Sequence, residues 1–344
     1  MSLITYLTRV HFADRVLEDA LPEEMSRLRL RRVLVATDAA GEVEDHYDRL
    51  VDALPAGAAA VPMRGVRAPL RPQAVHHASE AVEQLGCDGV VGLGGAAALD
   101  LARLAGGGRR PVIVVPTTTA SVGLGPVALA PKGCQALPAV VLCDPTLTLG
   151  APVDATAAAA MDALTHCIEA YLGTAWNPPA DGIAIEGVRR AGGHIERAVR
   201  DGQDLVARRE LLAAALCAGL AAQKGLGGVH ALAHALEAEP GLSARHGSLH
   251  AALLPPVLEF NAPAVADRFT ALHQALALDR GTDLPQAIAA LGARLALPVR
   301  LGHLGLDACA LDRIAARAAE DPANRTNPRL AGAADYRRLL EAAL

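Results

Sequence analysis

Apolar and polar positions alternate along the first 150 residues in a pattern of short strands separated by amphipathic stretches. Apolar side chains recur at helical spacing in residues 75–85. Four runs rich in valine, leucine and isoleucine are typical of buried strands, at residues 32–37, 89–93, 111–115 and 139–143. Residues 4–12 can add a strand at the edge. Strands that alternate with helices predict an α/β fold with a mostly parallel sheet and helices on both faces.

The pattern changes after Pro152, where β-rich runs become rare. Long alanine- and leucine-rich helices are predicted at residues 155–172, 180–200, 205–224 and 229–238. Asp154 and Asp204 are placed as N-caps. The sequence therefore predicts two domains, an α/β domain over residues 1–151 and an all-helical domain over residues 152–344.

Composition restricts the classes of function. The chain has 344 residues, of which 52% are hydrophobic and 20% charged, so it can bury a sizeable core. A net charge of −5, no basic stripe and only 2% aromatic residues argue against nucleic-acid binding. No apolar run reaches the roughly 18 residues of a membrane span, and charges near the start argue against a signal peptide. Six cysteines without a C-x-x-C pair are typical of a reduced, cytoplasmic protein.

A candidate metal site lies in the helical part of the chain. Asp162 and His166 are four residues apart, as are His230 and His234, so each pair shares one face of a helix. His246 follows after a short loop. One carboxylate and three imidazoles suffice for a four-coordinate divalent ion. The alternative, histidines that are ordinary residues of a helix face, stays open on spacing alone.

These residues stand in motifs that resemble a known family. Residues 162–171, DALTHCIEAY, closely resemble the D-A-L-T-H-x-x-E-A-Y signature of iron-containing (group III) alcohol dehydrogenases. Residues 225–234, GLGGVHALAH, resemble its second signature, which His246-Gly247 continues. The likeness extends over nearly the whole chain, which is identified as a member of this family.

The resemblance implies a dinucleotide-binding α/β domain followed by a helical metal domain. It implies that Fe²⁺ or Zn²⁺ is held by Asp162, His166, His230 and His246. His234 matches the histidine that relays a proton beside the substrate, which is a small alcohol, an aldehyde or a keto acid. A homodimer is compatible with this expectation.

The cofactor motifs depart from those of the family. Residues 94–103, GGAAALDLAR, stand where the family has G-G-G-S-x-x-D-x-A-K. Two glycines that let the backbone approach a pyrophosphate remain. The positions carried over from this motif are Gly94, Gly95, Ala96, Ala97 and Asp100. Ala97 lacks the hydroxyl of the family's serine, which predicts weakened cofactor binding.

A second cofactor motif is altered further. Residues 116–124, PTTTASVGL, stand where the family has P-T-T-x-G-T-G-S-E. Thr117 and Thr118 survive, and Ser121 keeps a hydroxyl. The segment up to residue 143 is short for the family, and Lys132 is the one lysine in it that can reach a cofactor.

Asp38 follows the first clear strand. A carboxylate there can accept a hydrogen bond from a ribose hydroxyl and repels a 2′-phosphate, which favours NAD(H) over NADP(H). A helix-capping or turn acid is the alternative.

Two other functions remain. His250, in HGSLH, resembles the second histidine of a maleylacetate reductase pattern, although that family's Y-A-G-S-E-M run is missing. A family member that kept its metal site but lost productive cofactor binding would act as a non-catalytic binding protein.

Overall fold

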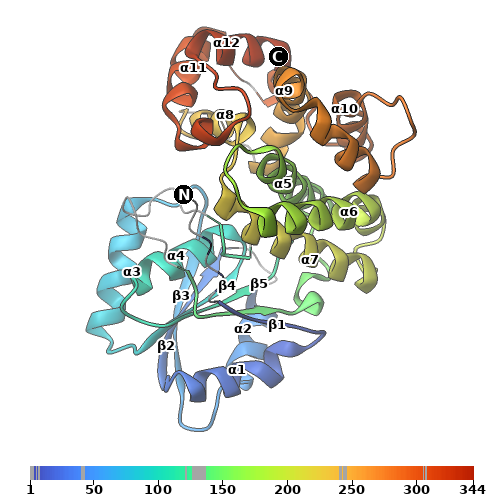
Figure 1. The fold of residues 1–344 in the computed structure, drawn as a ribbon. Coiled ribbons are helices and arrows are strands. Elements are labelled where there is room, and N and C mark those ends of the chain that lie inside the picture. Colours follow the sequence, from blue (N-terminus) through green and yellow to red (C-terminus); the bar gives the residue numbers. More distant parts are fainter. Residues whose placement is uncertain are drawn as a thin grey trace. The chain divides into compact units, whose positions relative to one another are not determined.

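The computed structural model describes residues 4, 6, 8–39, 43–120, 122–125, 137–239, 242, 246–304, 306 and 308–344. The chain divides into two compact units, which consist mainly of residues 5–150 and residues 151–344 (Figure 1).

A parallel sheet forms the centre of the first unit. Its described strands are β1 Arg9–Phe12, β2 Arg32–Asp38, β3 Ala59–Val66, β4 Gly89–Gly94, β5 Val112–Pro116 and β6 Val140–Cys143. The order across the sheet is β1-β6-β5-β4-β2-β3, with every pairing parallel. Because the chain leaves β2 toward β3 and later leaves β4 toward β5, the direction of winding reverses between β2 and β4. Parallel sheets bind ligands beyond the carboxyl ends of their strands at such a reversal.

Helices cover both faces of the sheet, as the sequence predicts. They are α1 Val16–Arg27, α2 Val43–Asp52, α3 Pro72–Gln84 and α4 Ala96–Gly106, and the short turn η1 Pro145–Thr148 ends the unit. Alternate side chains of a strand point to one face, so Val33 and Val35 share a core with Leu17 and Leu21 of α1. Helix α4 lies against the other face, beside α3.

The structure adds one strand that the sequence reading missed. The edge strand β3 is only partly buried and contains Pro62, so it lacks the continuous apolar run of a buried strand. The predicted strand over residues 4–12 is described only as β1 at its end.

The second unit is helical. Its described elements are α5 Val153–Leu172, α6 Pro178–Arg200, α7 Leu205–Ala221, η2 Ala222–Lys224, α8 Gly228–Glu237, α9 His246–Ala275, α10 Leu284–Arg294, η3 Leu301–Leu304, η4 Ala308–Ala310, α11 Leu311–Glu320, η5 Pro322–Thr326 and α12 Ala333–Ala343. Helix α5 is buried along most of its length. Asp204 caps α7 through the amide of Ala207, as predicted. The prediction for Asp154 is wrong, because α5 begins at Val153, so that Pro152 is the N-cap and Asp154 lies in the first turn.

No helix in the described ranges is long and apolar enough to cross a membrane.

Candidate functional site

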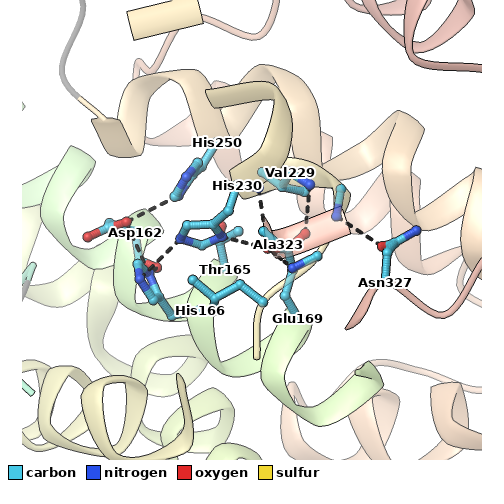
Figure 2. A network of polar contacts seen from close by, with 12 residues as sticks. Asp162, Thr165, His166, Glu169, Val229, His230, His250, Ala323 and Asn327 are labelled. Carbon is cyan, nitrogen blue, oxygen red and sulfur yellow. Dashed lines mark hydrogen bonds and ion pairs between the residues drawn. The ribbon is translucent and has the colours of Figure 1, made fainter. Parts of the chain in front are cut away.

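Three helices of the second unit bring their histidines together. Helix α5 carries Asp162 and His166, and helix α8 carries His230 and His234. Helix α9 carries His246 as its first residue and His250 one turn later. Figure 2 shows Asp162, His166, His230 and His250 converging from these helices. The four residues that each place one donor atom within 4.8 Å of the others are Asp162, His230, His246 and His250.

A glycine makes this convergence possible. A Cβ atom on Gly247 would lie 1.8 Å from the carbonyl oxygen of Ala158, far inside any allowed contact. Glycine therefore lets the start of α9 lie directly against α5, which brings the side chains of His246 and His250 to Asp162.

The distances within the cluster are short. Nε2 of His166 lies 3.1 Å from Nε2 of His230, and two ligands of one ion at about 2.1 Å are roughly 3 Å apart when they are at right angles. Oδ1 of Asp162 lies 3.2 Å from Nδ1 of His250 and 3.9 Å from Nε2 of His246. His166 thus stands at the edge of the group, next to His230.

Oxygen acceptors hold four of the imidazoles by their Nδ1 atoms. Each Nδ1–H donates to an oxygen, which leaves Nε2 as the nitrogen that can bind a metal, the arrangement typical of histidine ligands. The pairs are His166 with the Asp162 carbonyl at 3.0 Å, His230 with Glu169 at 2.5 Å, His246 with Glu237 at 2.7 Å, and His234 with Asp321 at 3.0 Å.

Glu169 also fixes the helix that carries His230. Its carboxylate accepts hydrogen bonds from the amides of Gly227 at 3.1 Å and Val229 at 2.7 Å, at the start of α8. Burial raises the pKa of Glu169 to about 7, although these amides act in the opposite direction. The residue therefore sets both the position of the helix and the orientation of the imidazole (Figure 2).

The residues of the cluster differ in the direction of their pKa shifts. Burial tends to raise the pKa of Asp162, but the neighbouring histidines, His166 above all, hold it well below its usual range. Burial lowers the pKa of His230 well below its ordinary value. Burial also lowers that of His246, but Glu237 and Asp162 outweigh it and raise the pKa to about 9. The carboxylate of Asp162 therefore stays ionised and the imidazole of His230 stays neutral, which are the forms in which these groups bind divalent transition metals.

Buried donor atoms without partners agree with this. Among the described residues, Oδ1 of Asp162 and both ring nitrogens of His250 are buried and make no hydrogen bond. Buried polar groups are rarely left unsatisfied. A divalent cation would satisfy Oδ1 of Asp162 and one ring nitrogen of His250, so the residues present fit such an ion.

The structure brings together all four residues that the sequence nominates as ligands, and places His234 beside them. His234 is not in the closely spaced group, and its side chain is 36% exposed. The sequence reading missed His250 as a donor, although His246 and His250 form a third pair at four-residue spacing. It did not nominate Glu169, although this residue is the acid of the D-A-L-T-H-x-x-E-A-Y signature. It also did not nominate Asp321, which no spacing rule distinguishes.

A second candidate site occupies the carboxyl ends of β4 and β5 in the first unit. Gly94 has a φ of +150°, which favours glycine, and its carbonyl accepts a hydrogen bond from the amide of Thr117 at 3.0 Å. Gly95 is the N-cap of α4, whose first residues are Ala96 and Ala97. Within the described ranges, the buried hydroxyls of Thr118 and Thr119 make no hydrogen bond. Free hydroxyls beside a helix N-terminus fit a phosphate group.

Asp38, the last residue of β2, contacts the turn between β4 and α4. Its carboxylate accepts a hydrogen bond from the amide of Gly95 at 2.5 Å. Burial raises its pKa, and the loop amides oppose the rise. The carboxylate thus acts as a cap for α4, which is the alternative role left open by the sequence.

Three other nominated cofactor residues have separate outcomes. Asp100 pairs with Arg103 at 2.9 Å, and burial raises its pKa to about 6. Ser121 and Lys132 lie outside the described residues.

Comparison with known proteins places the chain in a family. Residues 156–344 match the Fe-containing alcohol dehydrogenase family, C-terminal, and residues 8–123 match Iron-containing alcohol dehydrogenase. The 4-hydroxybutyrate dehydrogenase of Cupriavidus necator is 37% identical over 385 residues, which cover 99% of each protein. The chain belongs to the iron-containing alcohol dehydrogenase family. It is accordingly an oxidoreductase, and the resemblance inferred from its motifs is confirmed.

Solved structures of iron-containing alcohol dehydrogenases and their relatives share its fold. The crystal structure of 1,3-propanediol oxidoreductase has a TM-score of 0.89 at 25% identity and covers 99% of this chain and 100% of that one. The maleylacetate reductase of Rhizobium sp. strain MTP-10005 has a TM-score of 0.85 at 29% identity, covering 99% and 97%. The predicted fold class, a parallel α/β sheet followed by a helical region, is confirmed.

Proposed function

We propose that this protein is a metal-dependent oxidoreductase that interconverts an alcohol and an aldehyde or ketone with NAD(H). In this proposal residues 1–151 bind the dinucleotide, and residues 152–344 hold the metal and the substrate. The observation that carries it is the group of donor atoms that α5, α8 and α9 bring together, in which Oδ1 of Asp162 and both ring nitrogens of His250 are buried without a hydrogen bond among the described residues.

Asp162, His166, His230 and His246 would hold the divalent ion, Fe²⁺ or Zn²⁺. When bound, the ion supplies Lewis-acid stabilisation of negative charge on oxygen, and the nicotinamide supplies hydride transfer. Glu169 and Glu237 keep two of the ligands in the tautomer with a free Nε2.

His234 would move the proton between the substrate hydroxyl and solvent. Its side chain is the most exposed of the cluster, and its Nδ1 is held by Asp321 at 3.0 Å. Nε2 is therefore the nitrogen that exchanges the proton.

Gly94, Gly95 and the first turn of α4 would bind the pyrophosphate, with Thr118 as a hydroxyl donor. Asp38, held by the Gly95 amide, would place negative charge beside the ribose and favour NAD(H) over NADP(H).

Substitution of His234 tests this assignment of roles. His234→Ala is expected to keep the metal and to lower kcat by about 10²–10⁴-fold, the usual effect of losing a general acid–base group. The measurements are metal content by elemental analysis and NADH turnover with 4-hydroxybutyrate, 1,3-propanediol and the corresponding aldehydes. Loss of metal from His234→Ala would contradict the relay role. Unchanged metal content in Asp162→Ala would contradict the site itself.

Reduction of maleylacetate is the second candidate. His250 favours it, because the HGSLH segment resembles the maleylacetate reductase pattern. Maleylacetate belongs in the same substrate panel. If neither NADH nor NADPH binds detectably at millimolar concentration, both reactions are excluded and a non-catalytic binding role remains.

A further inference from the structure

His250 lies in the cluster but is not one of the four ligands of the proposed metal site. Its side chain is fully buried, at 0% exposure. Neither ring nitrogen makes a hydrogen bond to any residue that the structure describes. The other imidazoles of the cluster differ, because each has its Nδ1 bonded to a fixed oxygen.

The position of His250 points into the donor group. Its Nδ1 lies 3.2 Å from Oδ1 of Asp162, outside hydrogen-bond geometry, and that oxygen is itself without a hydrogen bond in the described part of the chain. Its ring centroid is 4.3 Å from that of His246 and 4.5 Å from that of His230. Three imidazoles and one carboxylate thus surround one small volume from three helices.

Second-sphere support for Asp162 is the competing explanation for His250. A histidine in that role donates an N–H to the carboxylate in a hydrogen bond. Nδ1 of His250 lies within ion-pair distance of Oδ1 of Asp162, at 3.2 Å, but makes no hydrogen bond to it, so it does not fix the carboxylate in this way. The place of this imidazole beside the other donor atoms is that of a metal ligand.

We propose that His250 is a direct metal donor, so that the site offers five protein ligands: Asp162, His166, His230, His246 and His250. This inference rests on the metal site of the proposed function. Five protein donors leave a position for substrate only on a six-coordinate ion. Zn²⁺ prefers four ligands, whereas Fe²⁺ and Co²⁺ accept six. The extra donor therefore selects against Zn²⁺.

Binding of Co²⁺ to the metal-free full-length protein tests the proposal without reference to turnover. His250→Phe keeps a ring and removes both nitrogens, and His250→Asn is a smaller second variant. His194→Phe is the matched control, because His194 lies on α6 and bonds the carbonyl of Arg190. Both His250 variants should bind Co²⁺ at least about 100-fold more weakly, at or beyond the limit for loss of a second-sphere partner. The visible spectrum of the remaining bound Co²⁺ should gain intensity as the coordination number falls, and selectivity should shift toward Zn²⁺.

The outcomes separate this proposal from the proposed function. If Asp162→Ala loses Co²⁺ while the His250 variants keep wild-type affinity and spectrum, the metal site stands and His250 is not a donor. If Asp162→Ala also binds normally, both proposals fail. Should the His250 variants not fold, a crystal structure of the wild-type protein with Co²⁺ decides. A His250 nitrogen at about 2.0–2.3 Å from the ion supports the proposal, and one beyond 3 Å overturns it.

Discussion

Glu24 in the first unit and Asp162 in the second are both buried carboxylates surrounded by basic groups. They differ in hydrogen bonding, because one oxygen of Asp162 has no hydrogen bond among the described residues. Glu24 accepts hydrogen bonds from Arg9 at 2.8 Å, His11 at 2.7 Å and Arg27 at 2.5 Å. Asp162 has His166 and His250 within 3.2 Å, yet its Oδ1 makes no hydrogen bond among the described residues. Composition therefore does not distinguish a structural ion pair from the proposed ligand site, and the unsatisfied donor atoms are the difference between them.

Removal of the metal should lower the stability of the protein through Asp162 and not through Glu24. This is the largest effect that we expect. A ligand at 1,000 times its dissociation constant stabilises the folded state by about 4 kcal/mol. Chelation should therefore lower the free energy of unfolding of the wild-type protein by that amount, measured by denaturant titration with and without Co²⁺. Asp162→Ala should be insensitive to chelator. Equal sensitivity in both proteins would remove the distinction between the two carboxylates.

Glu24 should control stability through pH and not through metal. Burial opposes ionisation of Glu24, but His11, Arg27 and Arg9 lower its pKa from 4.5 to about 2. Its stabilisation is therefore fully present above about pH 4.5 and is lost as the pH falls toward 2. Glu24→Gln should cost about 2–3 kcal/mol at pH 7 and flatten the acid limb of the stability curve.

The measurement for Glu24 is urea unfolding from pH 7 to pH 3, with Co²⁺ affinity determined in parallel. Glu18→Gln on the same helix is the control, since its partners Arg15 and Arg49 form a more exposed pair of contacts. A change in Co²⁺ affinity in Glu24→Gln would contradict the assignment of Glu24 as purely structural.

Glu169 tests whether the outer carboxylates belong to the metal site. Glu169→Gln keeps one acceptor oxygen, which can still serve the Val229 amide, but an amide nitrogen replaces the oxygen that accepts from Gly227 and His230. Co²⁺ affinity should fall by about 10–100-fold, the usual effect of losing a partner of a ligand. Glu186→Gln, on the exposed surface of α6, should leave it unchanged. Unchanged affinity in Glu169→Gln would mean that Glu169 holds α8 without tuning His230.

Unsatisfied polar atoms also occur in the first unit, where the hydroxyls of Thr118 and Thr119 make no hydrogen bond among the described residues. We expect a smaller effect there, on NADH binding. Ala97→Ser restores a hydroxyl in the first turn of α4 and should tighten NADH binding about tenfold, which corresponds to 1.4 kcal/mol. Ala74→Ser, in the first turn of α3, is the control. Nicotinamide fluorescence titration measures both. Tight binding by the wild-type protein, unchanged in Ala97→Ser, would show that other groups already hold the pyrophosphate.

Much of this architecture could be predicted, because short-range patterns in the sequence specify it. The buried strands β2, β4, β5 and β6 and the long helices follow from periodicity, and the convergence of Asp162, His166, His230 and His246 follows from four-residue spacing and the family motifs. The edge strand β3 could not be predicted, because partial burial leaves no period to detect. Partners such as Asp321, 87 positions from His234, could not be predicted either, because tertiary packing alone pairs them.

The origin of the donors on three separate helices has a consequence for folding. His166 and His230 lie 64 positions apart in the chain, so an ion that binds both closes a long loop, as a covalent cross-link would. Unlike a disulfide, this link forms and breaks with the free concentration of the ion. With the proposed ion bound, metal supply would set how long the helical unit stays folded, and a lack of the ion would shorten the lifetime of the protein.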